Sequence, residues 1–193
     1  MSTIVQHEKT MSTIVQHEIT AEEFWRTPDN EMKRELVKGE VIESMPPGGQ
    51  HGVVAGEVFV QLRMWMKKGY GGCAGIESGV ILARYPDTVR GPDVYYFRKE
   101  RIPKTGIPRA FWQIAPDLAV EVVSPYDTVK ELGDRVRDYL DAGTPMVWLV
   151  YFERKEVVVY TQAGTVRVYE AGDVLEGFDE VLPGFRCPVA ELF

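Results

Sequence analysis

Three acidic residues lie inside segments that are otherwise apolar, where an unpaired carboxylate is energetically costly. They are Glu35 in R-E-L-V, Asp93 near the start of P-D-V-Y-Y-F, and Glu121 in the middle of D-L-A-V-E-V-V. Two carboxylates held close together raise one another's pKa unless a cation neutralises them, and hard oxygen ligands favour Mg²⁺ or Mn²⁺. If Asp93 and Glu121 converge, they would form a divalent-metal site. The alternatives are a buried ion pair with an arginine, or an edge-strand glutamate that faces water.

The segment around Glu121 predicts how these acids are positioned. Residues 117–123 are almost continuously hydrophobic, which indicates a central strand covered on both faces. Side chains alternate along a strand, so Ala119, Glu121 and Val123 share one face, and Glu121 cannot face solvent if the strand is central. If the strand of Asp93 is its neighbour, the two carboxylates converge near one end of the sheet.

The remaining elements follow from hydrophobic period and from turn residues. Thr20 and Glu23 form a predicted capping box, and the segment 34–45 reads as a hairpin around Lys38 and Gly39. A helix over 51–68 is apolar around much of its circumference and should therefore be well covered. The segment 127–142 reads as an amphipathic helix with Val129, Leu132, Val136, Tyr139 and Leu140 on one face. Further strands are expected at 78–83, 92–97, 146–152 and 156–161, with short strands and an anchoring segment in the tail 164–193. This order predicts a mixed sheet flanked by helices.

Composition limits the class of protein and its location. The 193 residues, with 45% hydrophobic and 26% charged content, suit a single domain over 19–193, preceded by a duplicated and flexible segment 1–18. No stretch approaches the roughly 20 apolar residues of a membrane helix, so we expect no membrane partner and a cytoplasmic location. A net charge of −7 argues against broad attraction to nucleic acid. A local basic segment nevertheless contains Arg98, Lys99 and Arg101, which either contact phosphate or form a solvated surface connection.

Several motifs occur in a specific order over roughly residues 34–160. They are E-L-V-K-G-E, Q-H-G, G-P-D-V, P-D-L-A-V-E-V-V-S-P and R-V-R-D-Y-L-D-A-G-T-P-M-V-W-L-V. In this order they resemble the bacterial Uma-two family, described as restriction endonucleases, within the PD-(D/E)XK nuclease superfamily. The most specific part is E-V-V-S-P followed by a helix and W-L-V. The resemblance implies an α/β (α+β mixed) fold, with a restriction-endonuclease-like mixed central sheet flanked by helices, an N-terminal hairpin and C-terminal strands.

The resemblance also implies a metal site. Asp93 and Glu121 match the positions that bind the divalent ion, Mg²⁺ or Mn²⁺, and the main-chain carbonyl of Val122 would be a further ligand.

The lysine of the superfamily is absent from its usual place, two residues after the glutamate, where this chain has Val123. In the Uma-two pattern a helical lysine four residues before the tyrosine substitutes for it; here the tyrosine is Tyr139 and that position is Arg135. Arginine keeps a positive charge that can stabilise a phosphorane-like transition state, but it is a poor proton acceptor. Lys130, on the opposite side of the helix, is a weaker candidate.

Three other residues are candidates by the same resemblance. Glu35 matches a family acid that would hold metal or position water, unless it simply pairs with Arg34 or Lys38. Glu57, placed by the helical spacing among apolar neighbours, is its rival as third acid. His51 matches a histidine that would contact phosphate or orient water, although a helix-entry role is an equal alternative.

The implied function is a metal-dependent endonuclease that hydrolyses phosphodiester bonds of nucleic acid, with DNA as the expected substrate, by means of a metal-activated water. By analogy with nucleases of this fold, a homodimer is expected. The alternative is a catalytically inactive nuclease-fold protein that acts as a nucleic-acid-binding or regulatory module and depends on Arg98, Lys99 and Arg101.

Overall fold

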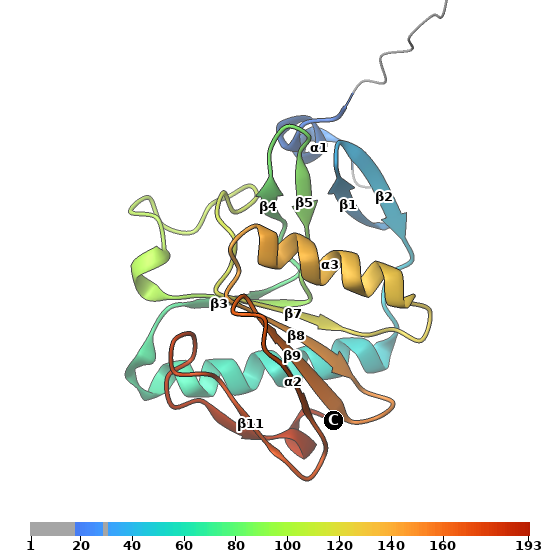
Figure 1. Cartoon of the computed structure of the whole chain (residues 1–193). Coiled ribbons are helices and arrows are strands. Elements are labelled where there is room, and N and C mark those ends of the chain that lie inside the picture. Colours follow the sequence, from blue (N-terminus) through green and yellow to red (C-terminus); the bar gives the residue numbers. More distant parts are fainter. Residues whose placement is uncertain (1–17, 29–30) are drawn as a thin grey trace, which may run out of the picture.

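The computed structural model describes residues 18–28 and 31–193 (Figure 1). The duplicated segment lies outside these residues up to position 17, so its expected flexibility and the domain boundary remain predictions. The helices are α1 (Ala21–Arg26), α2 (Gly49–Trp65) and α3 (Val129–Asp141), with shorter turns η1 (Met66–Tyr70), η2 (Lys99–Arg101) and η3 (Val189–Leu192). The strands are β1 (Lys33–Val37), β2 (Glu40–Ser44), β3 (Cys73–Ile76), β4 (Val80–Ala83), β5 (Thr88–Arg90), β6 (Val94–Phe97), β7 (Leu118–Val122), β8 (Met146–Tyr151), β9 (Glu156–Thr161), β10 (Val166–Tyr169), β11 (Val174–Glu176) and β12 (Arg186–Pro188).

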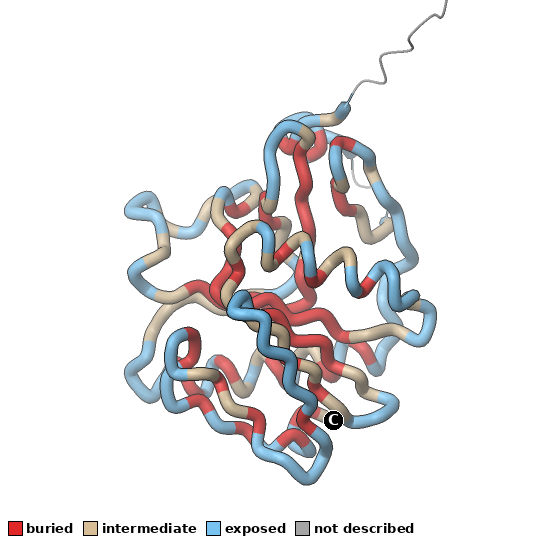
Figure 2. Tube along the Cα trace, viewed as in Figure 1, coloured by how far each residue is buried: buried red, intermediate tan, exposed pale blue. Residues whose placement is uncertain are grey.

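The main sheet has six strands in the order β10-β9-β8-β7-β6-β3. The pair β7–β8 is parallel and α3 lies between its strands in the chain, whereas the other pairs are antiparallel. All five residues of β7 are buried, and Figure 2 shows this central strand in red. The predictions of a mixed sheet and of a central strand at Glu121 are therefore confirmed. The predicted neighbour is also confirmed, because Val94 of β6 pairs with Val120 of β7.

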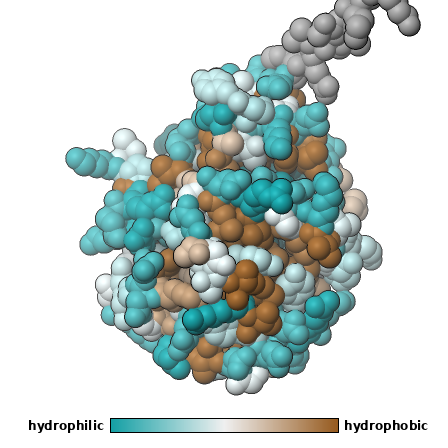
Figure 3. All heavy atoms as spheres, viewed as in Figure 1, coloured by the Kyte–Doolittle hydropathy of each residue, from teal (hydrophilic) through white to brown (hydrophobic). Residues whose placement is uncertain are grey.

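The two long helices cover opposite faces of this sheet. The face that packs on α2 carries Val120 and Trp148, whereas the other face carries Ala119, Val147 and Leu149 against α3. Because Glu121 follows Ala119 by two residues, its side chain is directed toward α3. The outer surface of α3 forms a hydrophilic band across the molecule (Figure 3).

A second, smaller sheet has the order β2-β1-β5-β4. Its hairpin turns at Lys38 (φ 50°) and Gly39 (φ 79°), and two consecutive positive φ angles suit the right-handed twist of the flanking strands. The predicted hairpin is confirmed, but the strand expected at 78–83 belongs to this sheet and not to the main one. One end of this sheet is covered by α1, whose predicted capping box of Thr20 and Glu23 is present.

Two local predictions about the helices were wrong. Although α2 is apolar over most of its surface, Val53 (62%), Val60 (45%) and Met64 (46%) are exposed, because only one side of α2 meets the sheet. Val129 is 90% exposed and does not belong to the buried face of α3. It lies at the first turn of that helix, beyond the edge of the contact with the sheet.

The expected tail strands and anchoring segment are confirmed: β11 pairs with β12, and Val189 and Leu192 of η3 are buried in the core cluster on the α2 side.

None of the helices in the described part of the chain has the length and apolar character that a membrane span requires.

Candidate active site

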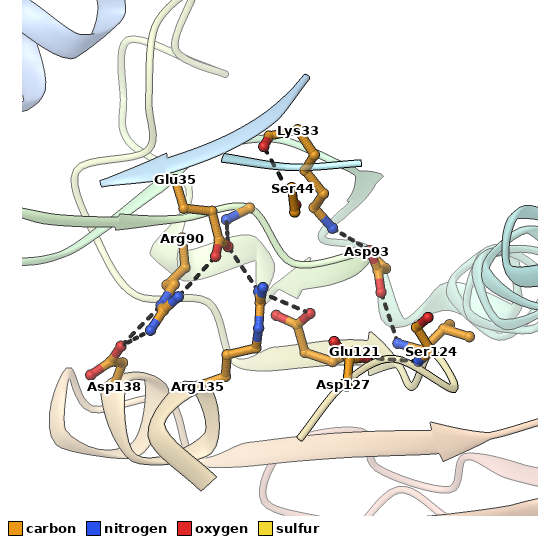
Figure 4. A network of polar contacts seen from close by, with 12 residues as sticks. Lys33, Glu35, Ser44, Arg90, Asp93, Glu121, Ser124, Asp127, Arg135 and Asp138 are labelled. Carbon is orange, nitrogen blue, oxygen red and sulfur yellow. Dashed lines mark hydrogen bonds and ion pairs between the residues drawn. The ribbon is translucent and has the colours of Figure 1, made fainter. Parts of the chain in front are cut away.

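The three acids that the sequence singles out converge where the two sheets meet. Glu35 comes from β1, Asp93 immediately precedes β6, and Glu121 comes from β7 (Figure 4). All three are buried, with exposed fractions of 4%, 1% and 4%. Three cations face them in the same figure, one each from β1, β5 and α3: Lys33, Arg90 and Arg135.

Asp93 is held by donors on both carboxylate oxygens. Lys33 Nζ lies 2.8 Å from Oδ1, His51 Nε2 lies 3.1 Å from Oδ2, and the Val122 amide donates to Oδ2 at 2.8 Å. Burial alone would raise the pKa of Asp93, but the hydrogen bond from His51 and the charge of Lys33 outweigh it and hold the pKa at about 2. Asp93 is therefore ionised at neutral pH.

His51 enters the site from the first turn of α2 and lies directly beside Asp93. Burial disfavours the charged imidazole, but the hydrogen bond to Asp93 and its negative charge prevail and raise the pKa of His51. Its Nδ1 atom is buried and has no hydrogen-bond partner within residues 18–28 and 31–193.

Glu35 joins β1 to β5 and to α3 through three donors. Its Oε2 accepts from Arg90 at 2.8 Å, and its Oε1 accepts from Arg135 and from the Gly91 amide, both at 3.0 Å. Burial opposes ionisation, but Arg135 and Arg90 overcome it and lower the pKa of Glu35. Arg90 also contacts Asp138 at 2.6 Å, which fixes its guanidinium. The expected partners Arg34 and Lys38 are thus replaced by two arginines that are distant in sequence.

Glu121 is the least neutralised of the three acids. Its Oε1 accepts a hydrogen bond from Tyr139 at 2.7 Å, whereas Arg135 Nη1 approaches its Oε2 only to 3.6 Å. Burial raises the pKa of Glu121 to about 7. The positive charge of Arg135 lowers this pKa, whereas the negative charge of Asp93 raises it further. The site therefore retains a carboxyl group whose ionised form lacks full compensation.

Arg135 lies between two acids, which limits its freedom. The same Nη1 atom contacts Glu35 at 3.0 Å and Glu121 at 3.6 Å, and the side chain is 18% exposed. Arg135 therefore lies on the side of α3 that faces the acids. Lys130 is 87% exposed and pairs with Asp134, so it lies away from the site as expected.

Other predicted residues are not brought together with the acids. Arg98 and Arg101 both bind the buried Asp117, at 2.7 and 3.0 Å, beside the opposite end of β6. Because β6 lies between Asp93 and Arg98, these arginines are about 13–16 Å from Asp93 along the strand. Lys99 belongs to the same turn, η2.

Glu57 was expected among apolar neighbours and is exposed, so that prediction of its surroundings was wrong. It lies on the side of α2 that faces away from the sheet.

Sequence reasoning missed Lys33, Arg90 and the contact made by Tyr139. Lys33 had a usable signal, since it precedes Glu35 by two residues and must share its face of the strand. Arg90 had none, because β5 has three residues and its pairing with β1 is not local in sequence.

A divalent ion at this site would depend on few protein ligands. In the described residues no group of three or more histidine, cysteine, aspartate or glutamate side chains could hold a metal ion. Mg²⁺, however, typically binds through one or two carboxylates and keeps several waters or phosphate oxygens as its other ligands. Asp93 and the incompletely neutralised Glu121 fit such a two-carboxylate site, and the main chain of Val122 lies next to Asp93.

The two-sheet architecture and the carboxylate cluster define a mixed α/β protein of the restriction-endonuclease-like class. A crystal structure described as "a putative nuclease belonging to DUF820 from Anabaena variabilis" matches with a TM-score of 0.78 and 25% sequence identity. The match covers 91% of this chain and 97% of that chain. Residues 21–190 match the family Uma2, described as "Putative restriction endonuclease", and the chain belongs to this family. No curated protein matches the chain.

Proposed function

We propose that this protein is a divalent-metal-dependent endonuclease that hydrolyses phosphodiester bonds, with DNA as its substrate. The observation that carries the proposal is the buried pair Asp93 and Glu121, in which Asp93 is ionised and burial raises the pKa of Glu121 to about 7 despite the Arg135 contact at 3.6 Å. The family and the nuclease-like neighbour support nuclease activity and a nucleic-acid substrate. A homodimer and a cytoplasmic location belong to the same proposal.

Asp93 and Glu121 are the proposed ligands of Mg²⁺ or Mn²⁺, together with the carbonyl of Val122. The ion, when bound, would supply an activated water and neutralise charge on the scissile phosphate. Hydrolysis adds water across one P–O bond: the water oxygen bonds to phosphorus, and the departing sugar oxygen takes up a proton.

Arg135 and Glu35 form the fixed part of the proposed site. Their ion pair at 3.0 Å holds a positive charge beside Glu121, where negative charge develops in the reaction. Because Arg135 is bound by two acids, it is suited to stabilising charge and to positioning Glu121, with Glu35 as the residue that orients it.

Lys33 is the proposed mobile cation of the site. It is 22% exposed and contacts Asp93 Oδ1, an oxygen at which a metal ion would compete with it. A lysine ammonium sits on a flexible four-carbon stem, so Lys33 can turn from Asp93 toward a phosphate oxygen. In the superfamily, the lysine lies on the same strand as the glutamate. Here the proposed lysine lies on β1 instead. His51, adjacent to Asp93, is proposed to orient water or phosphate.

The second candidate function is binding of nucleic acid without cleavage, through Arg98, Lys99 and Arg101. Two of these residues are already paired with Asp117, which leaves them less free to contact phosphate. The nuclease proposal is therefore favoured.

Cleavage of supercoiled plasmid and of single-stranded DNA tests the proposed function. We expect wild-type protein to cleave with Mg²⁺ or Mn²⁺ and to stop when EDTA is added, and Asp93→Asn to be inactive. The matched control is Asp134→Asn, which removes a half-exposed carboxylate on α3 and should cleave like wild type. Binding by wild type that depends on Arg98 and Arg101, without cleavage in either metal, would favour the second candidate.

A further inference from the structure

A groove of about 680 Å³ opens beside the acid cluster. Its volume lies within the range of small-molecule sites. Lys33, Arg90 and Gly91 line this groove, and the same three residues contact Asp93 or Glu35. The groove is therefore continuous with the candidate active site, and its occupant would lie next to a phosphate bound there.

One wall of the groove is aromatic and comes from α1 and from the loop before β7. Phe24, Trp25 and Phe111 contribute it. The ring of Trp25 meets Phe111 edge to face, with 5.1 Å between centroids, and Phe111 stacks on Phe24 at 5.7 Å. Phe24 is buried, whereas Trp25 remains 52% exposed on this wall. The wall thus offers a large indole surface whose orientation is fixed by packing from behind.

The charges of the groove suit a neutral aromatic ligand attached to a phosphate. Arg34 lies with its guanidinium 5.7 Å from the Phe24 ring centroid and donates a long bond of 3.5 Å to the Thr27 carbonyl. Arginine binds phosphate well, and Arg34 is on the same strand as Lys33. The carboxylates of Glu31 and Glu77 also line the groove and oppose a continuous run of phosphates within it.

We propose that this groove binds one unpaired nucleobase of the substrate, stacked on Trp25, while the adjoining phosphate reaches Lys33 and the acids. The inference rests on the proposed nuclease function and specifies its substrate as single-stranded or unpaired nucleic acid. Inside a duplex both faces of a base are covered by its stacked neighbours, so a stacking wall selects a base that has left the duplex.

Binding without cleavage tests this inference separately from catalysis. Fluorescence anisotropy in EDTA, at one fixed salt concentration, would compare a labelled single-stranded oligonucleotide with the duplex of the same sequence. We expect wild type to bind the single strand more tightly. Trp25→Ala should weaken single-strand binding by about 10-fold or more and leave duplex binding within about 2-fold. Trp25→Phe should restore most of the loss, because phenylalanine keeps an aromatic face.

The matched control is Tyr85→Ala, which truncates a 94% exposed aromatic side chain at the β4–β5 turn and should change neither affinity. Near-ultraviolet circular dichroism would establish that Trp25→Ala is folded. Tighter binding of the duplex by wild type, or equal effects of Trp25→Ala on both ligands, would overturn the inference. Metal-dependent plasmid cleavage by wild type would still support the proposed function in that case, so the two failures are distinguishable.

Discussion

Glu121→Gln is expected to lower DNA cleavage by about 10³-fold or more while making the metal-free protein more stable at pH 8. Cleavage falls because an amide replaces one of the two proposed carboxylate ligands. The stability rises because burial, with Asp93 nearby, raises the pKa of Glu121 to about 7, so the ionised carboxylate is disfavoured in the folded state. Glutamine keeps the shape and can still accept the hydrogen bond from Tyr139.

The sign of the stability change depends on pH. An acid whose pKa is higher in the folded protein than in the unfolded chain destabilises the fold increasingly as pH rises through that interval, here from about 4.5 to about 7. Guanidinium unfolding in EDTA should therefore show a gain on the order of 1–3 kcal/mol at pH 8 and little gain at pH 5. A loss of stability at pH 8 would contradict this reading of Glu121, and unchanged cleavage would remove it from the site.

Lys33→Met is expected to reduce cleavage by about 10²–10³-fold, because it removes the cation that we propose contacts the phosphate. Asp93 keeps its bonds from His51 and from the Val122 amide, so the cost in free energy of unfolding should stay within about 2 kcal/mol. Lys33→Arg, which retains the charge, should lose no more than about 10-fold. The measurement is the initial rate of plasmid nicking together with chemical unfolding of each variant.

Arg135→Met should lower the free energy of unfolding more than Lys33→Met does. It breaks buried ion pairs to Glu35 and Glu121 and should lower the free energy of unfolding by about 3–5 kcal/mol.

Lys130→Met is the control for removal of a lysine in Lys33→Met. Lys130 is 87% exposed on α3, and this variant should behave like wild type. Wild-type cleavage by Lys33→Met would show that this lysine does not act on the substrate.

The sequence was most informative where local patterns alone define an element. The continuous apolar run around Glu121 identified the central strand, and the residues Lys38-Gly39 identified the hairpin turn that carries Glu35. The convergence of Asp93 and Glu121 followed once their strands were taken as neighbours, which the pairing of Val94 with Val120 confirms.

What could not be predicted depends on contacts between distant segments. The strands β3 and β5 are short and carry little period of their own, so the separation of the smaller four-stranded sheet from the main sheet was missed. The pairing of Glu35 with Arg90 and Arg135 joins residues 55 and 100 positions apart, and no local pattern encodes it. Glu57 was misplaced because the apolar spacing on α2 continues around a side on which Val53, Val60 and Met64 are exposed.

Calorimetric titration of Mn²⁺ is the most direct measurement of the central claim, that Asp93 and Glu121 form a divalent-cation site. Wild-type protein should bind Mn²⁺, Asp93→Asn and Glu121→Gln should lose that binding while remaining folded, and Asp134→Asn should bind as wild type does. Absence of Mn²⁺ binding by folded wild type, or equal binding by Asp93→Asn, would contradict the account.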